Sequence, residues 1–142
     1  MGRILGIDYG DVRTGIAISD ETGFLASGVG TLESSGDAKL IEKIAGTIAQ
    51  YGDVSSIVVG EPVNMDGTRG ARSEKAREFA RKLGLRTGLT VELYDERRTT
   101  LAASVFMNET DTRGKKRKAS IDTLSAEIIL QNYLDRKHNQ GG

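Results

Sequence analysis

The sequence has no cysteine and no tryptophan, a single proline, and no apolar run long enough to span a bilayer. The lack of cysteine excludes disulfides and thiolate metal sites, and it leaves oxygen ligands, which suit magnesium or manganese. The chain begins with strand-like sequence and lacks the basic and apolar regions of a signal peptide. We therefore expect a cytoplasmic protein that does not associate with membranes.

An excess of charge of one sign is also missing, because 20 basic and 20 acidic residues balance. Over 142 residues, a content of 37% hydrophobic and 28% charged residues is typical of one soluble domain with its own core. We expect this domain to cover residues 1–137. Residues 138–142 contain no apolar anchor, so we expect a frayed C-terminal tail.

The hydrophobic pattern predicts an α/β fold. Short apolar runs typical of strands lie at residues 4–7, 16–18, 23–32, 56–59 and 90–94, and helical spacing of apolar residues occurs at 37–50, 73–83, 101–107 and 121–136. The first three strands follow one another without a helix, which predicts an antiparallel arrangement. Helices then alternate with the remaining strands.

The only proline lies in the segment G-E-P-V-N-M-D-G-T-R-G, residues 60–70, which has no regular period. This segment follows a predicted buried strand, so we expect a loop at the carboxyl end of that strand. Ligands commonly bind at this end of the strands in open α/β sheets. The loop therefore either contacts a substrate or serves as a plain connector.

Carboxylates stand at the ends of three predicted elements. Asp8 ends the first strand, Asp95 and Glu96 follow the last strand, and Asp122 lies in the first turn of the last helix. Each has a structural alternative: shaping a glycine-rich turn, pairing with neighbouring arginines, or interacting with the helix dipole. Parallel strands that end at one sheet edge would bring the first acids together, and a helix crossing that edge would add Asp122. The combination therefore points to one shared site.

Basic residues gather in two places. Arg97 and Arg98 are adjacent, and R-G-K-K-R-K occupies residues 113–118 without an acidic residue. The second run is either a solvated loop or a surface that meets a polyanion.

Four motifs in the chain resemble those of the YqgF/RuvX family. They are G-I-D-Y-G at 6–10 with R-T-G-I-A-I-S-D at 13–20, V-V-G-E-P-V-N-M-D-G-T at 58–68, D-E-R-R-T-T at 95–100, and K-A-S-I-D-T-L-S-A-E-I-I-L-Q-N-Y-L at 118–134. The resemblance implies a ribonuclease H-like fold, in which a mixed five-stranded sheet of three antiparallel strands followed by parallel strands is flanked by helices. It also implies a nuclease that matures the 5′ end of pre-16S ribosomal RNA in ribosome biogenesis, in a family described as similar to Holliday junction resolvases.

The same resemblance assigns residues to this chemistry. Asp8, Glu96 and Asp122 match the family's catalytic acids and are expected to bind two Mg²⁺ or Mn²⁺ ions, an arrangement that suits phosphodiester hydrolysis. The residues expected to contact nucleic acid are Arg13, Asn64, Arg97, Arg98, Lys115, Lys116, Arg117 and Lys118. Aromatic residues make up only 5% of the chain, so we expect phosphate contacts to contribute more affinity than base stacking.

Two residues depart from the family pattern. Glu61 stands where the Gly-x-Pro loop more often has an apolar residue, and Arg98 stands where leucine is frequent. We expect Glu61 to add negative charge, and Arg98 positive charge, near the phosphate path.

Other functions fit parts of the pattern. A Holliday junction resolvase acting on branched DNA would use the same acids, and a ribosome-assembly factor could bind RNA without cleaving it. G-I-D-Y-G before a hairpin also resembles the first phosphate loop of the actin and hexokinase superfamily, but those ATPases need two related domains. We expect precursor 16S rRNA as the partner, or branched DNA for the resolvase alternative. The protein is expected to be a monomer or homodimer.

Overall fold

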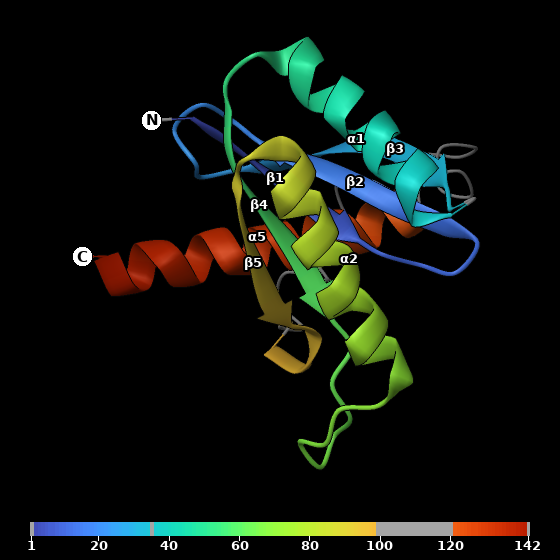
Figure 1. The fold of residues 1–142 in the computed structure, drawn as a ribbon. Coiled ribbons are helices and arrows are strands. Elements are labelled where there is room, and N and C mark those ends of the chain that lie inside the picture. The colour runs from blue at the N-terminus through green and yellow to red at the C-terminus, as the bar shows by residue number, and fades with distance from the viewer. Residues whose placement is uncertain (1, 35, 99–120, 142) are drawn as a thin grey trace.

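The computed structural model describes residues 2–34, 36–98 and 121–141. Its five-stranded sheet has the order β3-β2-β1-β4-β5 (Figure 1). The strands are β1 (Arg3–Asp8), β2 (Arg13–Ser19), β3 (Ala26–Glu33), β4 (Val54–Glu61) and β5 (Thr90–Asp95). β2 pairs antiparallel with β1 and β3, whereas β4 pairs parallel with β1 and β5. The predicted mixed sheet is therefore confirmed.

Helices cover both faces of this sheet. Helices α1 (Asp37–Tyr51) and α2 (Ala71–Thr87) lie on one face, and α5 (Ile121–Gly141) crosses the other. A short 3₁₀ turn, η1 (Glu96–Arg98), follows β5. None of the described helices is both long and apolar enough to cross a membrane. The helix expected at 101–107 lies outside the described residues.

Strand alternation divides the buried side chains into two cores. In β1, Leu5 and Ile7 pack with α1 and α2, whereas Ile4 packs with α5. Because successive side chains of a strand point to opposite faces, Asp8 lies on the same face as Ile4. The first strand therefore carries its terminal carboxylate to the face that α5 crosses.

A row of small residues lets α5 approach the sheet closely. Gly28, Ala17 and Gly6 are cross-strand neighbours on β3, β2 and β1. A Cβ atom on Gly6 would lie 2.7 Å from the Cβ of Leu130, and one on Gly28 would clash with Thr123. Any larger side chain in this row would push the helix outward. The row thus fixes the position of α5 over the strand ends.

The C-terminal residues differ from our expectation of a frayed tail. Helix α5 continues to Gly141, and the His138 ring stacks on Phe24 with 3.8 Å between ring centroids. The His138 Nε2 atom also lies 2.9 Å from the backbone oxygen of Gly23. An aromatic and polar contact of His138 thus anchors the helix end in place of an apolar one.

Candidate active site

Asp8 occupies the end of β1 at the centre of the sheet, between β2 and β4. Its backbone partner in β2 is Gly15, and its side chain is half-buried. Arg13 begins β2 at the same edge, because antiparallel strands place the start of one beside the end of the other. Pairing of Asp8 with β2, and of the preceding Ile7 with Val59 of β4, restrains the backbone that carries the Asp8 carboxylate.

Glu96 meets Asp8 from the end of β5. It begins η1 directly after the strand, and both acids line one pocket of about 270 Å³. The other lining residues, Ser125, Ile128 and Ile129, come from α5. The sheet edge and the crossing helix therefore bring together two of the predicted acids.

The pKa of Glu96 is raised to about 7, from an ordinary value of 4.5. Burial is the main cause, and the negative charge of Asp8 is the next, with a smaller contribution from Asp95. The positive charge of Arg72 acts in the opposite direction. The pocket thus disfavours a second negative charge, as expected when two carboxylates share a partly desolvated site.

Asp122 approaches this site along α5. It lies in the first turn of the helix, three residues before Ser125, and residues at this spacing are neighbours on a helix surface. Its backbone is described by the structure, whereas its side chain lies outside the described part. The topology therefore places position 122 one turn from the pocket wall.

Gly60 allows Glu96 to reach this position. A Cβ atom on Gly60 would lie 2.7 Å from Oε2 of Glu96 and 2.6 Å from Cδ1 of Ile129. Glu96 therefore packs directly over the backbone of β4. Any side chain at position 60 would displace the carboxylate or the pocket wall.

Asp95 has a different environment from Glu96. Its carboxylate accepts hydrogen bonds from the backbone and guanidinium nitrogens of Arg97, the shortest at 2.7 Å from Nη2. Asp95 lines a separate pocket. The geometry therefore brings Glu96, and not Asp95, into the pocket with Asp8.

The predicted nucleic-acid contacts fall into three groups. Asn64 is exposed in the loop after β4, where its Nδ2 donates to Thr68 at 3.0 Å, and Arg97 also donates to the Met65 backbone oxygen at 3.4 Å. Arg13 is exposed at the sheet edge beside Asp8. The side chain of Arg98 and all of Lys115, Lys116, Arg117 and Lys118 lie outside the described residues.

Glu61 does not present the free negative charge that we expected. Glu61 ends β4 with its side chain only 5% exposed, and its Oε2 accepts hydrogen bonds from Arg69, Ser73 and Arg77 at 2.8, 2.6 and 2.7 Å. Burial alone would raise the pKa of Glu61, but the bonds from Ser73 and the two arginines outweigh it and hold the pKa below its ordinary value. Its charge is thus neutralised inside the protein and does not project into the loop.

Sequence reasoning missed two residues beside the acids. Arg72, at the start of α2, places positive charge near Glu96, and Ser125 contributes a hydroxyl to the pocket wall. The spacing of three residues from Asp122 could have identified Ser125. Arg72 had no comparable local signal, because it reaches the site through the packing of α2 against the sheet.

The residues of this pocket fit a divalent cation. Within the described residues, no three acidic or histidine side chains gather as a complete metal site. Asp8 and Glu96 nevertheless supply two carboxylates, the ligand type that Mg²⁺ and Mn²⁺ prefer. Their mutual repulsion is the electrostatic condition that a bound cation relieves.

Comparison with solved structures identifies the fold. A Thermus thermophilus RuvC in complex with a Holliday junction substrate matches with a TM-score of 0.70 and 11% identity, covering 98% of this chain and 97% of the other. A second structure of Thermus thermophilus RuvC matches with a TM-score of 0.66 and 12% identity, covering 98% and 96%. These similarities confirm the predicted ribonuclease H-like fold.

Curated relatives cover nearly the whole chain at much higher identity. A protein from Ruminiclostridium cellulolyticum is 44% identical over 94% of both chains, and one from Clostridioides difficile is 45% identical over 97% of both. A third, from Halothermothrix orenii, is 42% identical over 99% of both. All three carry the name "putative pre-16S rRNA nuclease".

A family model described as "RuvX: Holliday junction resolvase" matches residues 2–136. This match spans every described strand and both acids of the pocket. The chain therefore belongs to the RuvX family.

Proposed function

We propose that this chain is a metal-dependent endonuclease that hydrolyses phosphodiester bonds, and that its substrate is the 5′ region of precursor 16S rRNA. The observation that carries the proposal is the meeting of Asp8 and Glu96 in one pocket at the carboxyl ends of β1 and β5, the parallel strands on either side of β4. The names of the relatives support precursor 16S rRNA as substrate, and we propose ribosome biogenesis in the cytoplasm as the setting. We assign the activity to one domain over residues 1–137.

In this proposal Asp8, Glu96 and Asp122 would hold two Mg²⁺ or Mn²⁺ ions. When bound, such ions activate water and neutralise charge on the phosphate and the leaving oxygen. Asp8 would be the fixed ligand, because its backbone pairs with Gly15 of β2 and the preceding residue, Ile7, pairs with Val59 of β4. Glu96 would have to be deprotonated to serve as a ligand, and its pKa of about 7 leaves part of the protein protonated at this position near neutral pH.

The surrounding residues position the nucleic acid. Arg72 brings positive charge toward the acidic pocket, where it can attract a non-bridging phosphate oxygen. Ile128 and Ile129 supply an apolar wall that limits access of bulk water. We propose sequence-independent phosphate contacts from the remaining predicted residues: Arg13, Asn64, Arg97, Arg98, Lys115, Lys116, Arg117 and Lys118.

The first test is Asp8→Asn, which removes charge with little change in size. Wild-type protein should cleave precursor 16S rRNA in the presence of Mg²⁺, and the variant should fold normally but lose cleavage. Asp11→Asn is a matched control, because Asp11 is a nearby but exposed acid, 4.0 Å from Lys75. Full activity of Asp8→Asn would contradict the proposed role of this acid.

A four-way DNA junction should be tested as substrate in parallel. Cleavage of the junction but not of the RNA would favour a resolvase, the activity in the family description. Binding of the RNA without cleavage by wild-type protein would instead indicate a ribosome-assembly factor. Both results would overturn the proposed function.

A further inference from the structure

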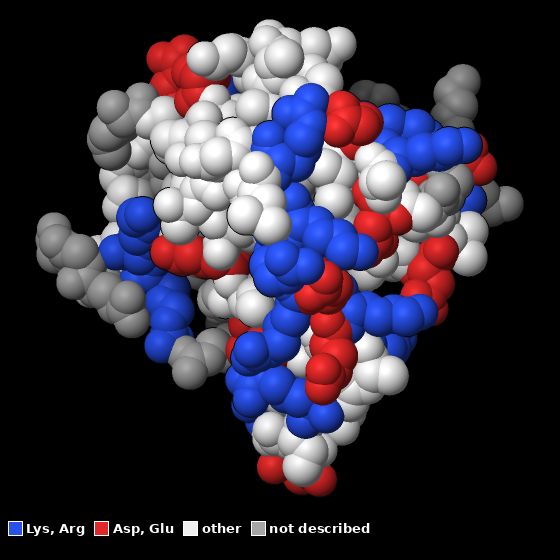
Figure 2. Space-filling view, viewed as in Figure 1, with Lys and Arg blue, Asp and Glu red and all other residues white. Residues whose placement is uncertain are grey.

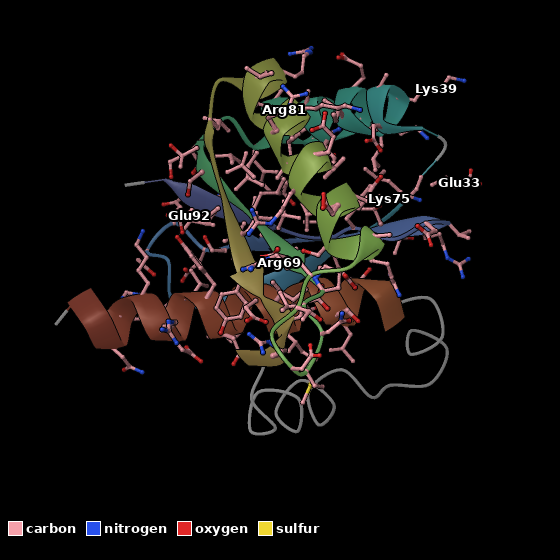
Figure 3. All side chains as sticks on the ribbon, turned by 60° about the horizontal axis from the view of Figure 1, so that its bottom comes forward. Glu33, Lys39, Arg69, Lys75, Arg81 and Glu92 are labelled. Carbon is pink, nitrogen blue, oxygen red and sulfur yellow. The ribbon has the colours of Figure 1, made fainter. Side chains whose placement is uncertain are left out.

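A second pocket, of about 570 Å³, lies beside the active-site pocket. Residues 92–95 of β5 form one wall, Tyr133, Arg136 and Lys137 of α5 form another, and Glu61, Arg69 and Arg77 complete the lining. Figure 3 shows Arg69 and Glu92 close to β5. The pocket is therefore bordered by the edge strand and carries cationic side chains from two separate parts of the chain.

Glu61 holds two of these cations in place. Its buried carboxylate accepts hydrogen bonds from the Nε atoms of Arg69 and Arg77, whose side chains remain 49% and 48% exposed. These bonds leave the terminal guanidinium nitrogens as donors for a ligand. One carboxylate shared by two guanidinium groups also leaves net positive charge, so the cluster is a preorganised anion receptor.

Helix α5 supplies two further cations, Arg136 and Lys137. The Lys137 Nζ atom lies 5.8 Å from the centroid of the Tyr133 ring. Glu92 is hydrogen-bonded to the neutral hydroxyl of Tyr133 and keeps its charge, whereas Asp95 is paired with Arg97, and the basic side chains of the lining outnumber the acidic ones. The net charge available to a ligand is thus positive. Figure 2 shows basic side chains in a band over the face on which α2 lies, with acidic side chains between them.

The two pockets are neighbours along α5. Ile129 lines the active-site pocket and Tyr133, one helical turn later, lines the second pocket. Glu96 and Asp95 likewise face different pockets from consecutive positions. From Ile128 to Arg136 the helix rises roughly 12 Å at about 1.5 Å per residue. This distance corresponds to roughly three or four stacked nucleotides at about 3.4 Å each.

We propose that the second pocket binds the phosphodiester backbone of the substrate a few nucleotides from the bond that is cleaved. This inference rests on the proposed nuclease function for the identity of its ligand. Arg69, Arg77, Arg136 and Lys137 contact phosphate oxygens, whereas Glu61 acts as a positioning residue for the first two. The site would bind the nucleotides that flank the cleavage position through their phosphates, without recognising their bases.

The test is the double variant Arg136→Gln/Lys137→Gln, made in an Asp8→Asn background so that binding is measured without cleavage. Binding of a fluorescent single-stranded RNA is followed by anisotropy over a range of salt concentrations. Loss of two phosphate contacts should lower the slope of log K against log salt by about 1.4, because each contact contributes about 0.7 for single strands. An unchanged slope would overturn the proposal.

The control is Lys39→Gln/Lys43→Gln, which removes the same charge from exposed positions on α1. Figure 3 shows Lys39 well separated from Arg69. This control should leave the slope near the wild-type value, and an equal loss in both double variants would contradict a localised site. Arg69→Gln provides a second variant, which should lower the slope by about 0.7 if Arg69 contacts one phosphate.

Shortened RNAs and a DNA strand of the same sequence distinguish the remaining possibilities. Removing flanking nucleotides should weaken RNA binding by the Asp8→Asn protein. The same removal should weaken binding by the double variant less, because part of the contact is already lost. If the double variant loses affinity for RNA, for DNA or for both, the second pocket is a phosphodiester site, and the comparison shows which nucleic acid it binds. Unchanged affinity for both would overturn the proposal. If wild-type protein fails to cleave but the double variant still loses affinity, the proposed function fails and the binding site stands.

Discussion

Replacing Glu96 with glutamine should stabilise the metal-free protein at alkaline pH, although it removes a proposed catalytic acid. The side chain keeps nearly the same shape but cannot become negatively charged beside Asp8. In the wild type, burial and the Asp8 charge oppose ionisation of Glu96 and raise its pKa to about 7. The folded protein therefore pays a free-energy cost whenever Glu96 is ionised without a cation nearby.

The size and sign of this effect follow from the two pKa values. Below pH 4.5 the carboxyl is protonated in both the folded and the unfolded chain, so it has no such cost. As pH rises from 4.5 to about 7, the unfolded chain ionises first and the wild type loses stability. The full difference corresponds to about 3 kcal/mol at about 1.4 kcal/mol per pKa unit. Because Glu96 is only partly buried, solvent screening reduces the expected gain to about 2 kcal/mol at pH 8.

Urea unfolding of both proteins at pH 4.5 and pH 8, with a chelator present, measures this difference. The free energies of unfolding of the two proteins should nearly coincide at pH 4.5, and Glu96→Gln should be the more stable at pH 8. In thermal unfolding at pH 8 its melting temperature should be roughly 4–8 °C higher. Glu74→Gln is a control, because Glu74 is an exposed acid in the first turn of α2. A variant less stable than wild type at pH 8 would refute the reasoning.

Three further substitutions test residues that hold the two pockets and helix α5 in position. Gly60→Ala should change the free energy of unfolding by no more than about 1 kcal/mol, because the new methyl group meets the movable ends of side chains. It should nevertheless displace Glu96 and reduce cleavage at least tenfold. Gly46→Ala, where a Cβ meets nothing within 4 Å, is the stability control. Glu61→Gln should cost about 2 kcal/mol at pH 7 in urea unfolding. Because the Glu61 pKa is lowered in the folded state, that cost should diminish as pH falls below 4.5, and a constant cost would contradict the assignment. His138→Ala should cost about 1 kcal/mol and increase amide hydrogen exchange at the end of α5, and unchanged exchange would contradict the anchoring role.

The sheet could be predicted from the sequence because its determinants are local. The apolar runs around Ile4 and Val58 mark strands by composition and length, and the absence of a helix before residue 37 favours antiparallel pairing of the first three. The position of Asp8 at a strand end follows from the same pattern. Once β1, β4 and β5 are parallel neighbours, the meeting of Asp8 with the end of β5 follows from topology.

The environments of the acids could not be predicted, because they depend on contacts across the fold. Glu61 and Glu96 both stand at or directly after the carboxyl end of a parallel strand, yet the pKa of Glu61 is lowered and that of Glu96 is raised. The difference comes from Arg69 and Arg77, which reach Glu61 from 8 and 16 residues further along the chain. No local pattern indicates that these arginines would turn toward Glu61 and not toward Glu96.

The position of α5 couples the stability of the core to the geometry of both pockets. Its close approach is fixed near the sheet centre, where Gly6 leaves room for Leu130. Within about one and a half turns of this contact the helix lines a pocket in each direction, through Ser125 on one side and Tyr133 on the other. A helix is rigid along such a distance, so a shift at Leu130 would move both walls together. A residue in the apolar core can therefore govern phosphate binding and catalysis without touching either ligand.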